Sequence, residues 1–332
     1  MGQIDFSIII PCFNSALTIK RTLQSIAKQD FDLKKIELII IDDCSTDLTT
    51  EVTQSFQEFD KFGQVFLTKT QINSGPGLAR NLGIEASIGR YILFVDSDDT
   101  LNPFALQELY KISLSGADII LFDGLDMSDK TTVICKHSKM LIASKYVKAK
   151  AILNLETDEH VIFSAYRRDF LYHIPRFAGG VYEDVEFSGW AYFQAKHIEH
   201  LPCTLINKFQ HSGQITENMT PAKAKLYMSA RLSLTRKIIE YCPAQNQELS
   251  MFFESGIRGS IAVTLKKLRK HSRSPKVFNA CLQDFFEFIC GEIDNLEFIV
   301  LNHNNTNKDI EALYFYSEWK KILYESKDYR TL

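Results

Sequence analysis

The sequence has no long apolar run. Nowhere among its 332 residues do about 18 apolar residues follow one another, so no segment is expected to span a bilayer. The first residues, Met1–Phe6, lack the basic and apolar stretches of a signal peptide. The seven cysteines are scattered without a Cys-x-x-Cys pair, which argues against a disulfide framework and a zinc site. These absences predict a cytoplasmic protein with reduced thiols.

Neither sign of charge is in large excess, since the chain has 38 Lys and Arg residues and 41 Asp and Glu residues. A dedicated nucleic-acid-binding protein would be strongly basic, so no nucleic-acid partner is expected. A Gly-x-Gly-x-x-Gly sequence after the first apolar run is also missing, which argues against a nicotinamide-dependent dehydrogenase. The chain does have 45% hydrophobic residues, enough to bury a large core in a main domain with a smaller second part.

From Phe6 to about Phe122, apolar runs alternate with helix-like segments. Continuous apolar runs are typical of strands buried on both faces of a parallel sheet, and the alternation implies helical crossovers. The sequence therefore predicts an α/β fold, a mostly parallel sheet with helices on both faces. In the first helix, Leu17, Leu23 and Ile26 are expected to face inward. Strands are expected at 6–10, 36–41, 64–68, 91–95 and 118–122, and helices at 16–28, 46–59, 78–86 and 103–114.

The rest of the chain changes character twice. Residues 123–213 are irregular, with a helix expected at 184–196 and a strand at 198–201, and are interpreted as an α+β extension over a cleft. After Thr220-Pro221, helical periodicity continues without convincing strands. We therefore divide the chain into a first domain, residues 1–216, and a helical C-terminal domain, residues 217–332.

A basic run, Lys266–Lys276, follows an apolar helical stretch in the C-terminal part. Such a cluster could bind anionic lipid headgroups, at about 1 kcal/mol per cation near the surface. The alternative is a solvated helix face. Peripheral contact with the inner face of the membrane is therefore one of two open possibilities.

The acidic stretch Asp96–Asp99 directly follows the apolar run Tyr91–Val95. Carboxylates at i and i+2 at the carboxyl end of a buried strand could hold a divalent cation, and this edge of an open α/β sheet is where ligands bind. Such oxygen ligands suit Mg²⁺ or Mn²⁺ bound together with phosphate oxygens. The alternative is a plain turn, because Asp readily bonds its own backbone.

Four further patterns occur in order along the chain. They are Pro11–Asn14 after the first strand, Asp42–Asp47 after the second, Asn73–Gly83 with its Gly-Pro-Gly turn, and Glu183-Asp184 after Gly179-Gly180. With Asp96–Asp99, they make the chain resemble the inverting, family-2 type of nucleotide-sugar glycosyltransferase with the GT-A fold, over about residues 6–216. The resemblance implies an enzyme of bacterial surface-polysaccharide synthesis.

The resemblance places the nucleotide at the first two patterns. It implies that Asp43 faces the base and that Pro11 and Phe13 shape the same pocket. Carboxylates at this position can accept hydrogen bonds from a base imide and from ribose hydroxyls. The alternative is that Asp42–Asp47 is a solvated turn.

The diphosphate and sugar are assigned to the next two patterns. The resemblance makes Asp98 the direct metal ligand and Asp96, with Ser97 beside it, a contact of the donor's ribose or sugar. Asp99 would support these residues from behind. Arg80, near the start of the helix after the glycine turn, can offer a forked cation to the diphosphate. Alternatively, it pairs with an acid at the surface.

Proton removal from the acceptor is assigned to Asp184, which lies where related enzymes carry their base. One carboxylate base with direct attack at the anomeric carbon predicts inversion. The alternative is that Asp184 only caps the helix that starts there. His211 lies where many relatives fold a short segment over the diphosphate, and it is either a third metal ligand, a phosphate contact or an inert loop residue.

These residues predict a glycosyltransferase that depends on Mg²⁺ or Mn²⁺. The expected donor is a UDP-sugar, and the expected acceptor is a hydroxyl of a growing surface glycan or a lipid-linked acceptor. The C-terminal helices are expected to contact acceptor, membrane or a second subunit. Two alternatives are a non-catalytic nucleotide-sugar-binding scaffold and a sugar-phosphate nucleotidyltransferase, although the latter's glycine-rich, basic N-terminal loop is missing from Pro11–Asn14.

Overall fold

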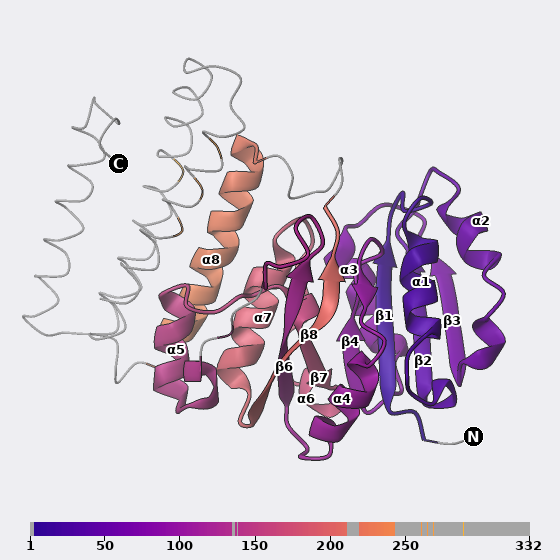
Figure 1. The fold of residues 1–332 in the computed structure, drawn as a ribbon. Coiled ribbons are helices and arrows are strands. Elements are labelled where there is room, and N and C mark those ends of the chain that lie inside the picture. Colours follow the sequence, from indigo (N-terminus) through magenta and orange to yellow (C-terminus); the bar gives the residue numbers. More distant parts are fainter. Residues whose placement is uncertain are drawn as a thin grey trace, which may run out of the picture. The chain divides into compact units, whose positions relative to one another are not determined.

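The computed structural model describes residues 3–134, 137, 139–210 and 219–242, with isolated positions at 260, 264, 268 and 288 (Figure 1). The chain divides into two compact units. One comprises Met1–Lys148 and Thr157–Ser212, and the other comprises Ala149–Glu156 and Gly213–Leu332.

The first unit is built on an eight-stranded sheet with the order β3-β2-β1-β4-β7-β6-β8-β5. Its first half is parallel, as predicted. There, β1 (Phe6–Cys12) lies between β2 (Ile36–Asp42) and β4 (Tyr91–Phe94), and β3 (Gln64–Lys69) pairs with β2. All residues of β1, β2 and β4 are buried, which explains why their sequences are continuously apolar.

The second half of the sheet is mixed. β7 (Ser164–Arg167) runs antiparallel between β4 and β6 (Ile119–Asp126), and β8 (Ile198–Lys208) is parallel to β6. β5 (Thr100–Leu101) is antiparallel to β8. The expectation of a mostly parallel sheet is confirmed, but the antiparallel β5 and β7 were not predicted, because strands this short carry no periodicity.

Helices cover both faces of the parallel half. The strand order runs from β1 to β3 in one direction and then returns to β4, so right-handed crossovers place α1 and α2 on one face and α3 on the other (Figure 1). The helices of this unit are α1 (Ile19–Ala27), α2 (Thr49–Gln54), α3 (Pro76–Ala86), α4 (Ala105–Ser113), α6 (Arg168–Leu171) and α7 (Glu183–Gln194), while α5 (Lys145–Leu153) runs from this unit into the other.

Of the helices predicted in the first unit, α1 and α2 differ most from their expected bounds. α1 begins at Ile19, because residues 15–18 form a turn in which the Ser15 carbonyl accepts hydrogen bonds from the amides of Thr18 and Ile19. As a result Leu17, expected to face inward, is 99% exposed. α2 ends at Gln54, several residues before the predicted end.

The second unit contains α8 (Pro221–Tyr241), which begins where helical periodicity was predicted to continue after Thr220-Pro221. Thr220 caps it by accepting a hydrogen bond from the Lys223 amide, and Arg231 donates to the carbonyl of Ile152 at 2.9 Å. The other helices predicted for the C-terminal domain, and the basic run apart from Leu268, lie outside the described residues. In the part of the chain that the structure describes, no helix is both long and apolar enough to cross a membrane.

Candidate active site

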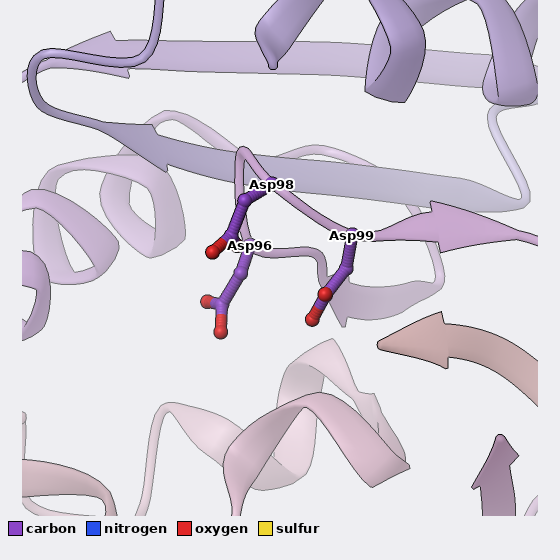
Figure 2. A group of neighbouring side chains, drawn as sticks. All are labelled: Asp96, Asp98 and Asp99. Atoms are coloured by element: carbon purple, nitrogen blue, oxygen red, sulfur yellow. The ribbon is translucent and has the colours of Figure 1, made fainter. Parts of the chain in front are cut away.

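Three carboxylates stand together where β4 ends. Asp96, Asp98 and Asp99 each present an oxygen within 4.8 Å of those of the other two, and Figure 2 shows the three side chains extending from one turn toward the same space. We call this segment, residues 96–99, the acidic turn. A donor set made only of carboxylate oxygens fits Mg²⁺ or Mn²⁺.

The acidic turn is held from behind by α1 and the segment before it. The Thr22 hydroxyl donates to the carbonyl oxygens of Ser97 at 3.0 Å and of Asp99 at 2.7 Å. The Ser97 hydroxyl is 2.7 Å from that of Ser15 and is buried. In this structure Ser97 therefore supports the turn, and its predicted contact with the donor stays a prediction.

Asp99 ties the acidic turn to the end of β8. Its buried carboxylate accepts a hydrogen bond from the Phe209 amide at 2.9 Å and lies 3.3 Å from Lys208 Nζ. Burial, together with the charges of Asp96 and Asp98, raises the pKa of Asp99 to about 7 against the opposing effect of Lys208. The sequence could not show this link, since more than a hundred residues separate the two segments.

Arg80 joins the acidic turn to the start of α7. Its buried guanidinium donates through Nη1 to Glu183 Oε1 at 2.5 Å and through Nη2 to Asp96 Oδ1 at 2.9 Å. Burial favours neutral forms, but the charges of Arg80 and Lys208 outweigh it and lower the pKa of Asp96. Arg80 therefore pairs with acids, as its alternative predicted, but inside the protein and not at the surface. Its contact with a diphosphate stays a prediction.

Asp184 occupies the first turn of α7. The N-cap is Tyr182, in a left-handed conformation with φ 64°, so the alternative that Asp184 caps the helix is wrong. Burial raises the pKa of Asp184, and the charges of Asp96 and Asp158 raise it further, against His160 and Arg80. A carboxylate with a raised pKa is a stronger base. Asp184 follows Glu183 directly, and Arg80 joins Glu183 to Asp96, so Asp184 lies at the same site as the acidic turn.

Sequence reasoning missed the pair formed by Asp158 and His160. His160 Nδ1 is hydrogen-bonded to the Asp158 carboxylate, and the ring packs edge-on against Phe163. Although burial opposes it, the charges of Asp158 and Asp184 raise the pKa of His160 to about 9. This half-exposed imidazolium acts on Asp184 from a stretch whose sequence has no recognisable pattern.

The residues predicted to bind the nucleotide lie at the carboxyl edge of β1 and β2. Pro11 is buried in β1, Phe13 is 44% exposed just beyond it, and the Asp43 amide donates to Cys12 next to them. The Asp43 carboxylate accepts hydrogen bonds from the amide of Gly75 at 2.7 Å and from the segment before it. Asp43 thus holds the chain entering α3, and its contact with a base stays a prediction.

The glycine turn packs against the segment that precedes α7. A Cβ on Gly77 would lie 2.5 Å from Glu183 Cγ and 2.7 Å from the Ala178 carbonyl oxygen. Asn81 fixes the same segment by exchanging two hydrogen bonds with the backbone of Phe177, at 2.9 and 3.0 Å. These contacts show why small residues are needed here. His211 lies outside the described residues.

Comparisons with known proteins identify the family of this chain. Residues 7–174 match the family model for glycosyl transferase family 2. Over 107 residues the chain is 38% identical to the poly(ribitol-phosphate) beta-N-acetylglucosaminyltransferase TarS of Staphylococcus aureus, covering 32% of this chain and 18% of TarS. It is 27% identical over 175 residues to the succinoglycan biosynthesis protein ExoO of Rhizobium meliloti, covering 50% of this chain and 49% of ExoO. The aligned part thus spans less than half of either relative.

The chain is also similar in fold to solved structures. The crystal structure of S. aureus TarS 1-349 in complex with UDP matches with a TM-score of 0.65 at 21% identity, over 98% of this chain and 93% of that chain. The mannosyltransferase PcManGT from Pyrobaculum calidifontis, in complex with GDP-Man and Mn²⁺, matches with a TM-score of 0.54 at 14% identity, over 97% and 89%. Since the family model covers half of the chain, the protein belongs to glycosyl transferase family 2, and its fold is GT-A.

Proposed function

We propose that this protein transfers a sugar from a UDP-sugar to a hydroxyl of a bacterial surface glycan or a lipid-linked acceptor, with inversion. The observation that carries the proposal is the double contact of Arg80, which brings the acidic turn and the first turn of α7 into one site. That a TarS structure contains UDP-GlcNAc supports a nucleotide-sugar donor. Family membership argues against a nucleotidyltransferase.

In this proposal the donor lies along the carboxyl edge of the sheet. Pro11, Phe13 and Asp43 hold the base, and Asp96 receives a hydroxyl of the ribose or the sugar. Arg80 adds positive charge close to the diphosphate. Because Arg80 is already paired with two carboxylates, it orients the site as well as contributing charge.

Asp98 is proposed as the direct ligand of Mg²⁺ or Mn²⁺, next to Asp96 and Asp99. When bound, the cation supplies Lewis-acid stabilisation of the charge that develops on the departing diphosphate. The all-oxygen donor set fits this ion. Lys208, whose pKa is raised by Asp99 and Asp96 despite burial, keeps a positive charge beside these carboxylates.

Asp184 is proposed as the general base. It takes the proton of the acceptor hydroxyl while the hydroxyl oxygen bonds to the anomeric carbon and the bond from that carbon to the diphosphate breaks. The attack comes from the side opposite the leaving group, which inverts the configuration. A partly buried carboxylate with a raised pKa suits this task near neutral pH.

Release of UDP tests the proposal. Purified protein is incubated with UDP-sugars and Mn²⁺, with and without glycan acceptors, and UDP is measured over time. We expect release by the unmodified protein and a loss of about a hundredfold or more in Asp184→Asn, as for removal of a general base. Asp169→Asn, an exposed carboxylate of α6, is the control. Donor binding without release under any condition would favour a non-catalytic scaffold.

A further inference from the structure

Arg21, exposed on α1, makes two specific contacts at the acidic turn. Its Nη2 donates to the backbone carbonyl oxygen of Asp98 at 2.6 Å. Its Cζ also lies 3.7 Å from the centroid of the Phe209 ring, well inside the range of a cation–π contact. One guanidinium thus touches both the turn and the residue that follows β8.

These contacts close a ring of interactions. Asp98 is covalently joined to Asp99, the Asp99 carboxylate accepts a hydrogen bond from the Phe209 amide at 2.9 Å, and the Phe209 ring returns to Arg21. We call this set the Arg21 ring. Its members come from α1, the acidic turn and the end of β8, so it links three segments that are distant in the sequence.

Arg21 also completes the support of the turn's backbone. Thr22 binds the carbonyl oxygens on either side, those of Ser97 and Asp99, and Arg21 binds the one between them. All three successive carbonyl groups are therefore fixed by α1. The peptide that follows Asp98 cannot rotate without breaking the bond to Arg21, so this bond restrains the backbone from which the Asp98 side chain extends.

We propose that Arg21 is a positioning residue that orients Asp98 for the divalent cation and locks the end of β8 to the acidic turn. This inference rests on the proposed function, because it uses Asp98 as the metal ligand. A planar guanidinium can donate to a carbonyl in its plane while its face lies over a ring, whereas a lysine ammonium is a point charge on a flexible stem. Arg21→Lys is therefore expected to be a poor substitute.

The test measures binding of Mn²⁺ alone, from the electron paramagnetic resonance signal of the free ion, on the full chain. Removing a group that orients a metal ligand typically weakens metal affinity by about tenfold or more, so this loss is expected for Arg21→Gln. Phe209→Leu keeps the amide but removes the ring, and it is expected to weaken binding in the same direction. Lys20→Gln, an exposed neighbour on the same helix, is the matched control.

Two further measurements make the outcome decisive. Thermal unfolding of Arg21→Gln, measured on the same samples, distinguishes weaker binding by the folded protein from loss of fold. Asp98→Asn separates the two proposals. If Asp98→Asn abolishes Mn²⁺ binding while Arg21→Gln binds like Lys20→Gln, the role of Arg21 is refuted and the proposed function stands. If Asp98→Asn also binds normally, both the metal role of Asp98 and the inference are overturned.

Discussion

Arg80 and Glu183 are separated by 103 residues in the sequence and form a buried ion pair of 2.5 Å. Glu183 is followed directly by Asp184, and Arg80 also holds Asp96 at 2.9 Å. The pair therefore fixes the distance between the proposed base and the acidic turn. Its integrity should matter for stability and for catalysis alike.

We expect Arg80→Gln to lower the free energy of unfolding by about 3 kcal/mol, because it leaves two carboxylates without their buried countercharge. Urea unfolding followed by circular dichroism measures this change. Lys20→Gln, on the surface of α1, is expected to stay within about 0.5 kcal/mol of the unmodified protein. A similarly small effect of Arg80→Gln would show that the ion pair does not hold the two segments together.

Gly77→Ala should push α3 away from the segment that leads into α7, without changing any charge. The added methyl group would lie 2.5 Å from Glu183 Cγ and 2.7 Å from a backbone oxygen, so α3 must shift. We expect a loss of about 1–3 kcal/mol in the free energy of unfolding, together with a drop in UDP release. Gly179→Ala is the control, since its Cβ would meet only a side-chain atom of Leu78 at 3.7 Å. Equal behaviour of the two variants would contradict the packing described.

The ionisation of Glu183 predicts how stability depends on pH. Burial raises the pKa of Glu183 to about 7 against the pull of Arg80, so the folded state holds a proton that the unfolded state releases near pH 4.5. The stabilisation that this proton adds to the free energy of unfolding is fully present below about pH 4.5 and is lost as the pH rises through 7.

Comparison with Glu183→Gln, which cannot ionise, isolates that contribution. Between pH 4.5 and 7.5 the unmodified protein should lose up to about 3 kcal/mol relative to the variant, at about 1.4 kcal/mol per pKa unit. Glu85→Gln, an exposed position on α3, should follow the unmodified protein. A constant difference between Glu183→Gln and the unmodified protein across this range would mean that Glu183 is ionised throughout.

We expect His160 to determine the pH at which activity is lost on the acidic side of the pH profile. The charged imidazolium lowers the pKa of Asp184, while Asp96 and Asp158 raise it, and Lys208 opposes the charge on His160. In His160→Gln the pKa of Asp184 therefore rises, and activity should fall at a higher pH than in the unmodified protein. The measurement is kcat/KM for UDP release against pH, with exposed His173→Gln as control. An acidic side of the profile that stays in place or moves to lower pH would exclude this role.

The sequence was sufficient for the elements whose signal is local. The strands β1, β2 and β4 are buried on both faces and so read as continuous apolar runs, and the acidic turn follows directly from the end of one of them. The order of the motifs identified the family. Asp184, as the candidate base, and the acidic turn could both be predicted from the sequence. Nothing in the sequence showed that Arg80 joins them.

The features that could not be predicted depend on long-range contacts. The pairing of Arg80 with Glu183, the link from Asp99 to Phe209 and the insertion of β7 between β4 and β6 each join segments that are far apart in the chain. The Asp158 and His160 pair lies in an irregular stretch without periodicity. Leu17 lies in the turn before α1, which is closed by backbone hydrogen bonds to Ser15, and its side chain is exposed.

A crystal structure of the protein with UDP and Mn²⁺ tests the central claim most directly, because anomalous scattering locates the ion independently of the protein density. We predict an ion coordinated by the Asp98 carboxylate and by both phosphates of UDP, with Asp184 facing the space just beyond the terminal phosphate. An ion bound elsewhere, or UDP bound away from the acidic turn with Asp184 directed out of the site, would contradict the account.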